Sequence, residues 1–111
     1  MIQHIVLFKF GASKELLDSF YSGVATLKEI EGVVDVNAGE HNNGYYNDYN
    51  YRSNGFAHVL HVTVEDKAAL ERYDKSEFHL DVKKKFILPC LDTDAPAPHV
   101  MAMDYESKLT K

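Results

Sequence analysis

Residues 2–10 constrain the fold most, because they alternate like a β-strand and are nevertheless largely apolar on both faces. One face carries the alternate residues Ile2, His4, Val6, Phe8 and Phe10. The other face carries Ile5 and Leu7. A strand that is apolar on both sides is typical of the centre of a sheet with both faces covered. The chain must therefore cover two faces of one sheet, with its own residues or with a second copy.

The length of the chain, 111 residues, is the usual size of one domain. We expect a single domain over residues 1–106 and a polar C-terminal tail over residues 107–111. Cys90 is the only cysteine, which excludes an intramolecular disulfide. Its neighbours Pro89 and Leu91 are more typical of a small buried residue than of a nucleophile.

The first half of the chain predicts a strand, a helix and two further strands. Ser13 is suited to cap an amphipathic helix that runs to about Ile30. A second strand follows at Val33–Gly39, and a Tyr- and Asn-rich loop occupies residues 40–54. The Asn-Gly turn signal that ends this loop precedes a third strand at Phe56–Val64, so strands two and three form a long hairpin.

The second half predicts a broken helical region and a last strand. Glu65 and Asp66 open a helix that carries Leu70 and Tyr73, and a further helical stretch runs from about Glu77 to Pro89. Residues 92–98 are a proline-containing connector, and a fourth strand covers His99–Tyr105. The β-α-β-β-α-β order indicates a ferredoxin-like α+β fold, with two helices on one face of a four-stranded antiparallel sheet. A second copy is the simplest cover for the other face, so we predict a homodimer.

Composition argues against several classes of partner. The net charge is -5, and a nucleic-acid-binding protein needs a basic surface to neutralise phosphates. The only basic cluster, Lys83–Lys85, lies on an expected helix and is typical of a solvated face. No segment approaches the ~18 consecutive apolar residues of a membrane span. We therefore expect a cytoplasmic protein that binds neither nucleic acid nor membrane.

Three segments in this order resemble the stress-responsive A/B barrel family. They are His4–Phe10, then Gly55–Leu60, then Tyr73 with His79 six residues later, and the resemblance extends from residue 1 to about residue 106. The chain is also similar to the olivetolic acid cyclase type within that family. The resemblance implies a dimeric α+β barrel and a tight homodimer.

In the cyclase-like members, two histidines on strands and a Tyr and His on the second helical region surround a pocket that folds a linear polyketide. By position, the resemblance assigns pocket-binding roles to His4 and His58, and catalytic roles to Tyr73 and His79. This chain departs from the family pattern at two places. Ser76 and Glu77 stand where many members have His and Pro, and the Tyr- and Asn-rich loop is an insertion.

The residues themselves leave the role of the histidines open. A histidine on an apolar strand face is either a satisfied core group or a pocket group, and this holds for His4 and His58. His61 falls on the opposite face, where a structural or interface role is expected. Tyr73 and His79 cannot share one face of a continuous helix, but a break capped by Ser76 would bring them together.

After such a break, a neutral His79 could accept a proton at physiological pH while Tyr73 donates a hydrogen bond to an enolate or carbonyl oxygen. The alternative is that His79 only caps a turn and Tyr73 only packs in the core. We predict no metal site and no cofactor, because helical His-x-x-x-His pairs, clustered cysteines and glycine-rich phosphate loops are absent.

Three functions remain open from the sequence. The first is a small homodimeric stress-response-type protein that binds an apolar or aromatic small molecule. The second is a cofactor-independent cyclase that closes an aldol bond with His79 as base and Tyr73 as donor, with an antibiotic-biosynthesis-type monooxygenase as a less favoured enzyme. The third is a subunit of a larger assembly that uses the loop tyrosines as a partner surface; the same loop could be a lid or a plain surface excursion.

Overall fold

The computed structural model of the chain describes residues 1–109 and has the predicted β-α-β-β-α-β order. The main elements are β1 (Ile2–Phe8), α1 (Lys14–Ala25), β2 (Val33–Glu40), β3 (His58–Val64), α2 (Lys67–Lys75), α3 (Glu77–Val82) and β4 (Val100–Glu106). Short helical segments extend α1 and α3: η1 (Thr26–Glu29), the π-helical η2 (Lys83–Ile87) and η3 (Leu88–Cys90).

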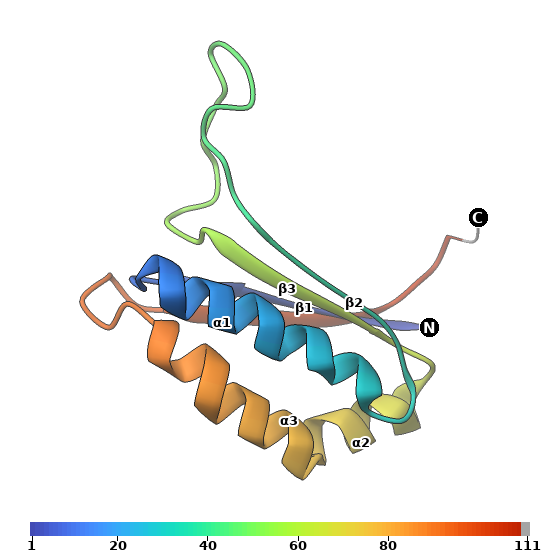
Figure 1. Ribbon diagram of the computed structural model, residues 1–111. Coiled ribbons are helices and arrows are strands. Elements are labelled where there is room, and N and C mark those ends of the chain that lie inside the picture. The colour runs from blue at the N-terminus through green and yellow to red at the C-terminus, as the bar shows by residue number, and fades with distance from the viewer. Residues whose placement is uncertain (110–111) are drawn as a thin grey trace.

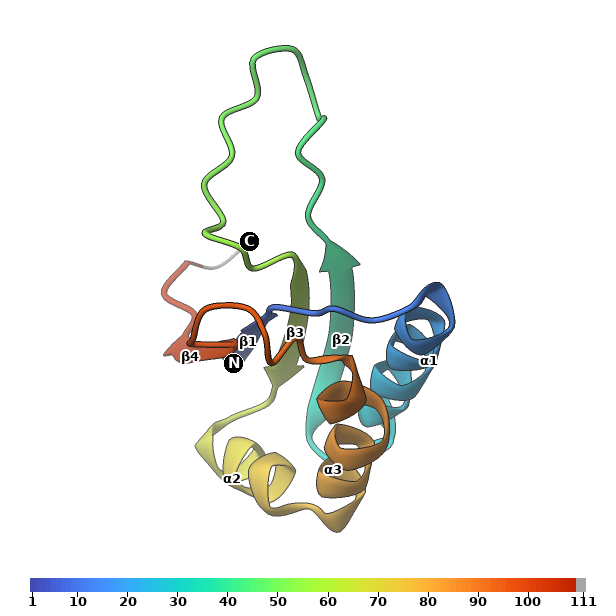
Figure 2. The ribbon, with the colours of Figure 1, turned by 90° about the vertical axis from the view of Figure 1, so that its left-hand side faces the viewer.

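The four strands form one antiparallel sheet in the order β2-β3-β1-β4, so β1 is a central strand as its two apolar faces predicted. Figures 1 and 2 show the helices gathered on one face of this sheet. The strands differ from the predicted ranges by one or two residues at their ends. Two ends differ by two residues: β1 ends at Phe8 and β3 begins at His58. Among the described residues, Phe10 makes a single bridge, to Leu91.

The three predicted helix starts are fixed by side-chain caps. The Oγ of Ser13 accepts the backbone N–H of Leu16 at 3.3 Å, and the Oδ1 of Asp66 accepts that of Ala69 at 2.9 Å. The Oγ of Ser76 accepts the N–H of His79 at 3.3 Å, which divides the second helical region into α2 and α3 as the sequence suggested. Each cap satisfies a donor that the helix itself leaves free.

The core lies between the helices and the facing side of the sheet. From the helices it receives Phe20, Val24 and Leu27, which are fully or almost fully buried. Gly23 allows α1 to pack closely, because a Cβ at this position would stand 2.3 Å from the ring of Phe86. Cys90 is buried among these residues, and its position agrees with the small-residue interpretation of the sequence.

The opposite face of the sheet carries no helix in residues 1–109 (Figures 1 and 2). We call it the open face. On β4 it presents Met101, Met103 and Tyr105, which are 50%, 63% and 44% exposed. Large apolar side chains that stay this accessible in adjacent positions are typical of an interaction surface.

The segment between β2 and β3, residues 41–57, projects well beyond the end of the sheet in both views and is called the arm below (Figures 1 and 2). Its tyrosines pack on one another and on His41, with ring centroids 5.0–6.3 Å apart. The arm therefore holds a local aromatic cluster, whose rings pack mainly within the arm.

Candidate functional site

A cavity of about 210 Å³ lies between the helix-covered face of the sheet and the second helical region. Strands β1, β3 and β4 form one wall, and α2, α3, η2 and η3 form the other. Its lining consists of His4, Val6, Phe8, Leu60, Tyr73, Asp74, His79, Lys83, Ile87, Leu88, Val100 and Ala102. Three of the four residues that the sequence singled out therefore share one mostly apolar space.

Tyr73 and His79 meet in this cavity because the helix breaks between them. The side-chain cap of Ser76 starts a new helix axis, and the two rings stack with centroids 4.3 Å apart and planes inclined by 31°. Tyr73 is completely buried. Within residues 1–109 its hydroxyl and the Nδ1 of His79 are buried without a hydrogen-bond partner. The hydroxyl of Tyr73 is therefore free to bind a guest in the cavity, and the ring of His79 can bind one beside the nearby backbone of Asp74.

Burial shifts the pKa values of His79 and Tyr73 in opposite directions. It lowers the pKa of His79, against the opposing effect of the backbone and carboxylate of Asp74. Burial also raises the pKa of Tyr73 far above its ordinary value, and the charges of Asp74 and Asp104 add to this. At neutral pH the imidazole is thus an uncharged proton acceptor and the phenol a hydrogen-bond donor. The pair has the acid and base character that carbonyl chemistry requires.

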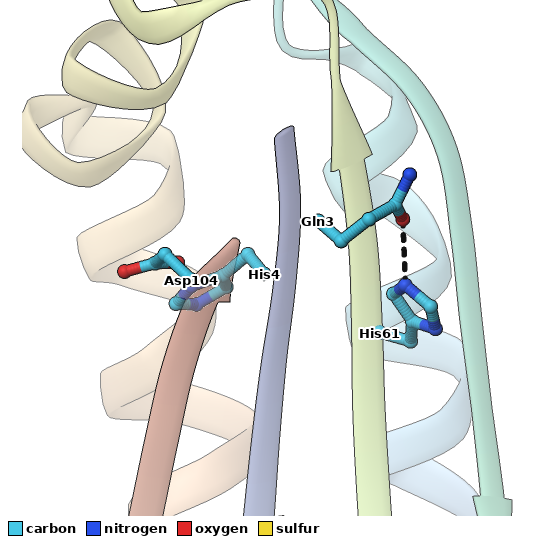
Figure 3. Close-up of polar contacts among 4 residues, drawn as sticks. All are labelled: Gln3, His4, His61 and Asp104. Atoms are coloured by element: carbon cyan, nitrogen blue, oxygen red, sulfur yellow. Dashed lines mark hydrogen bonds and ion pairs between the residues drawn. The ribbon is translucent and has the colours of Figure 1, made fainter. Parts of the chain in front are cut away.

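His4 reaches the same cavity from β1 and is held by a carboxylate on β4. Its Nδ1 lies 2.5 Å from Oδ1 of Asp104, and Figure 3 shows the two side chains next to each other. The ring of His4 meets that of Tyr73 edge to face at 5.6 Å. Because Asp104 occupies Nδ1, Nε2 is the nitrogen that is left for other interactions.

Sequence reasoning missed Asp104. One signal was available, since Asp104 alternates onto the same face as Val100 and Ala102 and is the one charged residue in the stretch 100–105. The pairing of His4 with Asp104 became visible only when the structure set the register of β1 and β4. A carboxylate opposite a histidine on the covered face of a sheet is a useful site signal once register is known.

His58 lies outside this cavity, contrary to the arrangement expected from the sequence. β1 and β3 are neighbours, but His58 pairs with Phe8, whereas His4 pairs with Val62 further along the strands. The ring of His58 packs against Phe10 at 4.9 Å, and burial lowers its pKa although Glu40 opposes the effect.

Both ring nitrogens of His58 are buried without a partner in the described residues, and Glu40 stands 3.9 Å from Nε2. His58 lines a different hollow of about 570 Å³, at the base of the arm. Any binding role of His58 is therefore separate from that of Tyr73 and His79.

His61 points to the open face, as its alternation predicted. Its Nε2 lies 2.7 Å from Oε1 of Gln3, and Thr63 donates its hydroxyl to the same oxygen at 2.7 Å. Figure 3 shows Gln3 and His61 as a pair separate from His4 and Asp104. His61 is thus held by definite partners on the open face.

The lining of the cavity favours an organic guest. Asp74 and Lys83 are the charged groups beside Tyr73 and His79, while the remaining walls are mainly aliphatic and aromatic. Within the described part of the chain, no three His, Cys, Asp or Glu side chains gather as metal ligands. None of the helices over the same residues is long and apolar enough to cross a membrane.

Known proteins resemble the chain over almost its full length. Residues 2–107 match the family described as Stress responsive A/B Barrel Domain. No curated protein sequence matches the chain.

Three solved structures show the same fold at low identity. The Arabidopsis thaliana protein At3g17210 has 24% identity and a TM-score of 0.76, with 100% of this chain and 99% of that chain covered. A hydroxynitrile lyase from Passiflora edulis has 18% identity and a TM-score of 0.75, covering 99% and 96%. A dimeric ferredoxin-like protein from Jannaschia sp. CCS1 has 19% identity and a TM-score of 0.70, covering 96% and 98%. At these identities the likeness establishes the fold, and function must be argued from the site.

Proposed function

The chain belongs to the stress-responsive A/B barrel family, and on that premise we propose that it is a small homodimeric stress-response-type protein that binds an apolar small molecule. The homodimer is supported by the exposed open face and by the solved relatives that are described as dimeric. The cytoplasmic location stays a prediction from the sequence.

One observation carries the ligand proposal. Among residues 1–109, the hydroxyl of Tyr73 and the Nδ1 of His79 are buried without hydrogen-bond partners, beside a cavity whose walls are mainly apolar. A buried polar group without a hydrogen bond costs about 1–3 kcal/mol, so native structures generally satisfy such groups with a ligand or an ordered water. A guest that satisfied both groups would recover that free energy on binding.

The chemistry of the two groups defines the kind of guest. The phenol of Tyr73 donates, so the guest needs an acceptor such as a carbonyl oxygen. The neutral imidazole of His79 accepts, so the guest needs a donor or an acidic C–H next to that carbonyl. Val6, Leu60 and Ile87 on the walls favour an apolar or aromatic body. A small aromatic ketone fits these requirements.

Calorimetric titration with acetophenone tests this proposal. Removal of one buried hydrogen bond to the ketone should weaken binding about tenfold or more in Tyr73→Phe. Tyr46→Phe is the matched control, since Tyr46 is exposed on the arm, outside the cavity. Equal binding by wild type and Tyr73→Phe, or equal loss in the control, would contradict the proposal. Native mass spectrometry of freshly purified protein would show whether a guest is already retained.

The second candidate is a cofactor-independent enzyme of the cyclase type, favoured by the 4.3 Å stacking of Tyr73 on His79. In this mechanism Nδ1 of His79 takes a proton from carbon next to a carbonyl, and the electron pair moves onto the carbonyl oxygen, where Tyr73 hydrogen-bonds the enolate. The enolate carbon then attacks a second carbonyl, forming a C–C bond. The imidazolium of His79 returns its proton to the new alkoxide.

This enzymatic candidate predicts a steep loss on mutation. His79→Ala should lower turnover of a linear diketone, read as aldol product, by about 10²–10⁴-fold, the usual contribution of a general base. Tyr73→Phe should lower turnover without removing ketone binding entirely. One solved relative is named a hydroxynitrile lyase, so cleavage of a hydroxynitrile is a second reaction to assay. Turnover that survives His79→Ala would exclude His79 as the base.

A further inference from the structure

A second hollow lies where the arm meets the open face of the sheet, and we call it the arm groove. Its volume is about 570 Å³. The sheet contributes Leu7, Val59 and Met101, all at positions that alternate onto the open face. The arm contributes residues that include Tyr45, Arg52 and Phe56. One wall of the groove is therefore the open face itself.

The arm is organised around this groove by its own contacts. At its base the N–H of His41 donates to the carbonyl of Ala57 at 2.7 Å, and the N–H of Ala57 donates to Phe8 on β1 at 3.1 Å. Further out, Tyr51 accepts the N–H of Gly55 through its hydroxyl at 2.7 Å. With its aromatic cluster, the arm is shaped before any partner binds, which reduces the entropy lost on association.

The arm groove is separate from the cavity that holds Tyr73 and His79 in the same protomer. Among residues 1–109, the cavity that holds Tyr73 and His79 has no lining residue from the arm. The arm therefore does not act as a lid over the cavity of the same chain. Its groove instead continues the apolar surface of Met101 and Met103, which remains exposed on β4.

We propose that the arm is a clamp for a second copy of this chain: when two open faces pack together, the arm groove receives an apolar side chain of the other protomer. This inference rests on the homodimer proposed above and assigns a function to the Tyr- and Asn-rich arm. A second copy is the fitting occupant because Leu7, Val59 and Met101 belong to both the groove and the open face. A second protomer that covers the open face therefore also occupies the groove.

The composition of the arm agrees with this occupant. Tyrosine and arginine are enriched where protein interfaces gain most of their binding free energy. Tyr45 and Arg52 both line the groove, and Tyr45 is 60% exposed in the single protomer. Burial of such a large and already ordered ring on dimerisation is favourable at small entropic cost.

Two neighbouring tyrosines offer a matched test. Tyr45 lines the groove, whereas Tyr46 does not, although it is 59% exposed and packs on Tyr49 just as Tyr45 does. Sedimentation equilibrium and subunit exchange with ¹⁵N-labelled protein would give the dimer dissociation constant and rate. We expect Tyr45→Ala to raise the dissociation constant about tenfold or more, and Tyr46→Ala to change it by less than about threefold.

Each outcome of this test is informative. Equal effects of Tyr45→Ala and Tyr46→Ala, or no effect of either, in a dimeric wild type would overturn the clamp and leave the homodimer intact. A monomeric wild type at tens of micromolar would overturn the homodimer and the clamp together. Acetophenone titration of the same samples reports on the cavity independently. Circular dichroism of both variants would confirm that the sheet and helices are unchanged.

Discussion

The regions around His58 and His79 both place a histidine beside aromatic rings, but the surroundings of the two histidines differ. His58 is buried and His79 is half-buried, both beside aromatic rings on the helix-covered side of one sheet, and burial lowers the pKa of each. The rings of Phe10, Phe20 and Tyr21 pack around His58, which also borders the arm groove. Around His79 a cavity of about 210 Å³ remains.

The two histidines differ in what surrounds them: His58 packs among aromatic rings at the base of the arm, whereas His79 borders the cavity together with Tyr73. The ring of His79 packs on the phenol of Tyr73. A second histidine, His4, is held nearby by Asp104. His58 has a carboxylate beyond hydrogen-bond reach and aromatic rings on several sides. Substitutions around His58 should therefore change stability, whereas substitutions around His79 should change binding or turnover.

The largest expected effect is the loss of Phe20 from the His58 region. Phe20 is completely buried and contacts Phe8, Phe10 and His58. Phe20→Ala should lower the free energy of unfolding by about 3–5 kcal/mol, measured by urea denaturation. Leu88→Ala, at the half-exposed edge of the cavity, is the comparison and should cost less than about 1 kcal/mol. Similar costs for the two variants would remove the contrast between the regions.

A smaller effect should follow from Asp104→Asn in the His79 region. The carboxylate of Asp104 is partly exposed, so loss of its charge should cost about 1 kcal/mol or less in unfolding free energy. An amide oxygen no longer favours a proton on Nδ1 of His4 as strongly, and ¹⁵N spectra should show a changed tautomer balance. Asp94→Asn, on the connector, is the charge-matched control. An unchanged His4 spectrum would show that Asp104 does not orient the ring.

Tyr73→Phe should have a still smaller effect on stability, and of the opposite sign to most core substitutions. The hydroxyl of Tyr73 has no partner in the described residues, and the ring keeps its packing. The free energy of unfolding should stay the same or rise by up to about 1 kcal/mol, as removal of an unsatisfied buried group predicts. A loss larger than about 1 kcal/mol would show that the hydroxyl is already satisfied in the empty protein.

The smallest expected effect is a change of stability with pH. The pKa values of His58 and His79 are lower in the folded chain than their ordinary value of about 6.5, so the unfolded chain binds protons first as the pH falls. Stability should therefore be constant well above pH 6.5 and decrease below it, until the folded histidines are protonated too. Proton spectra of the two rings should titrate below pH 6.5. Midpoints at or above 6.5 would contradict the burial argument for both regions.

The sequence predicted most of the fold because its signals are local. Alternation identified the central strand at residues 2–10, and Ser13, Asp66 and Ser76 marked the helix starts at which the structure has its caps. The break at Ser76 also predicted that Tyr73 and His79 meet. Strand ends moved by one or two residues, since pairing with a neighbour decides where a ladder stops.

The sequence by itself determined the order of elements, the two apolar faces of β1 and the candidate pair Tyr73 and His79, because period and capping depend on residues a few positions apart. Only the tertiary structure decided that His4 pairs with Asp104, one hundred positions away, and that His58 lies in an aromatic cluster at the base of the arm. It also decided that the arm borders the open face. Strand register and side-chain packing join distant segments, and a cavity exists only where those segments fail to fill the space between them.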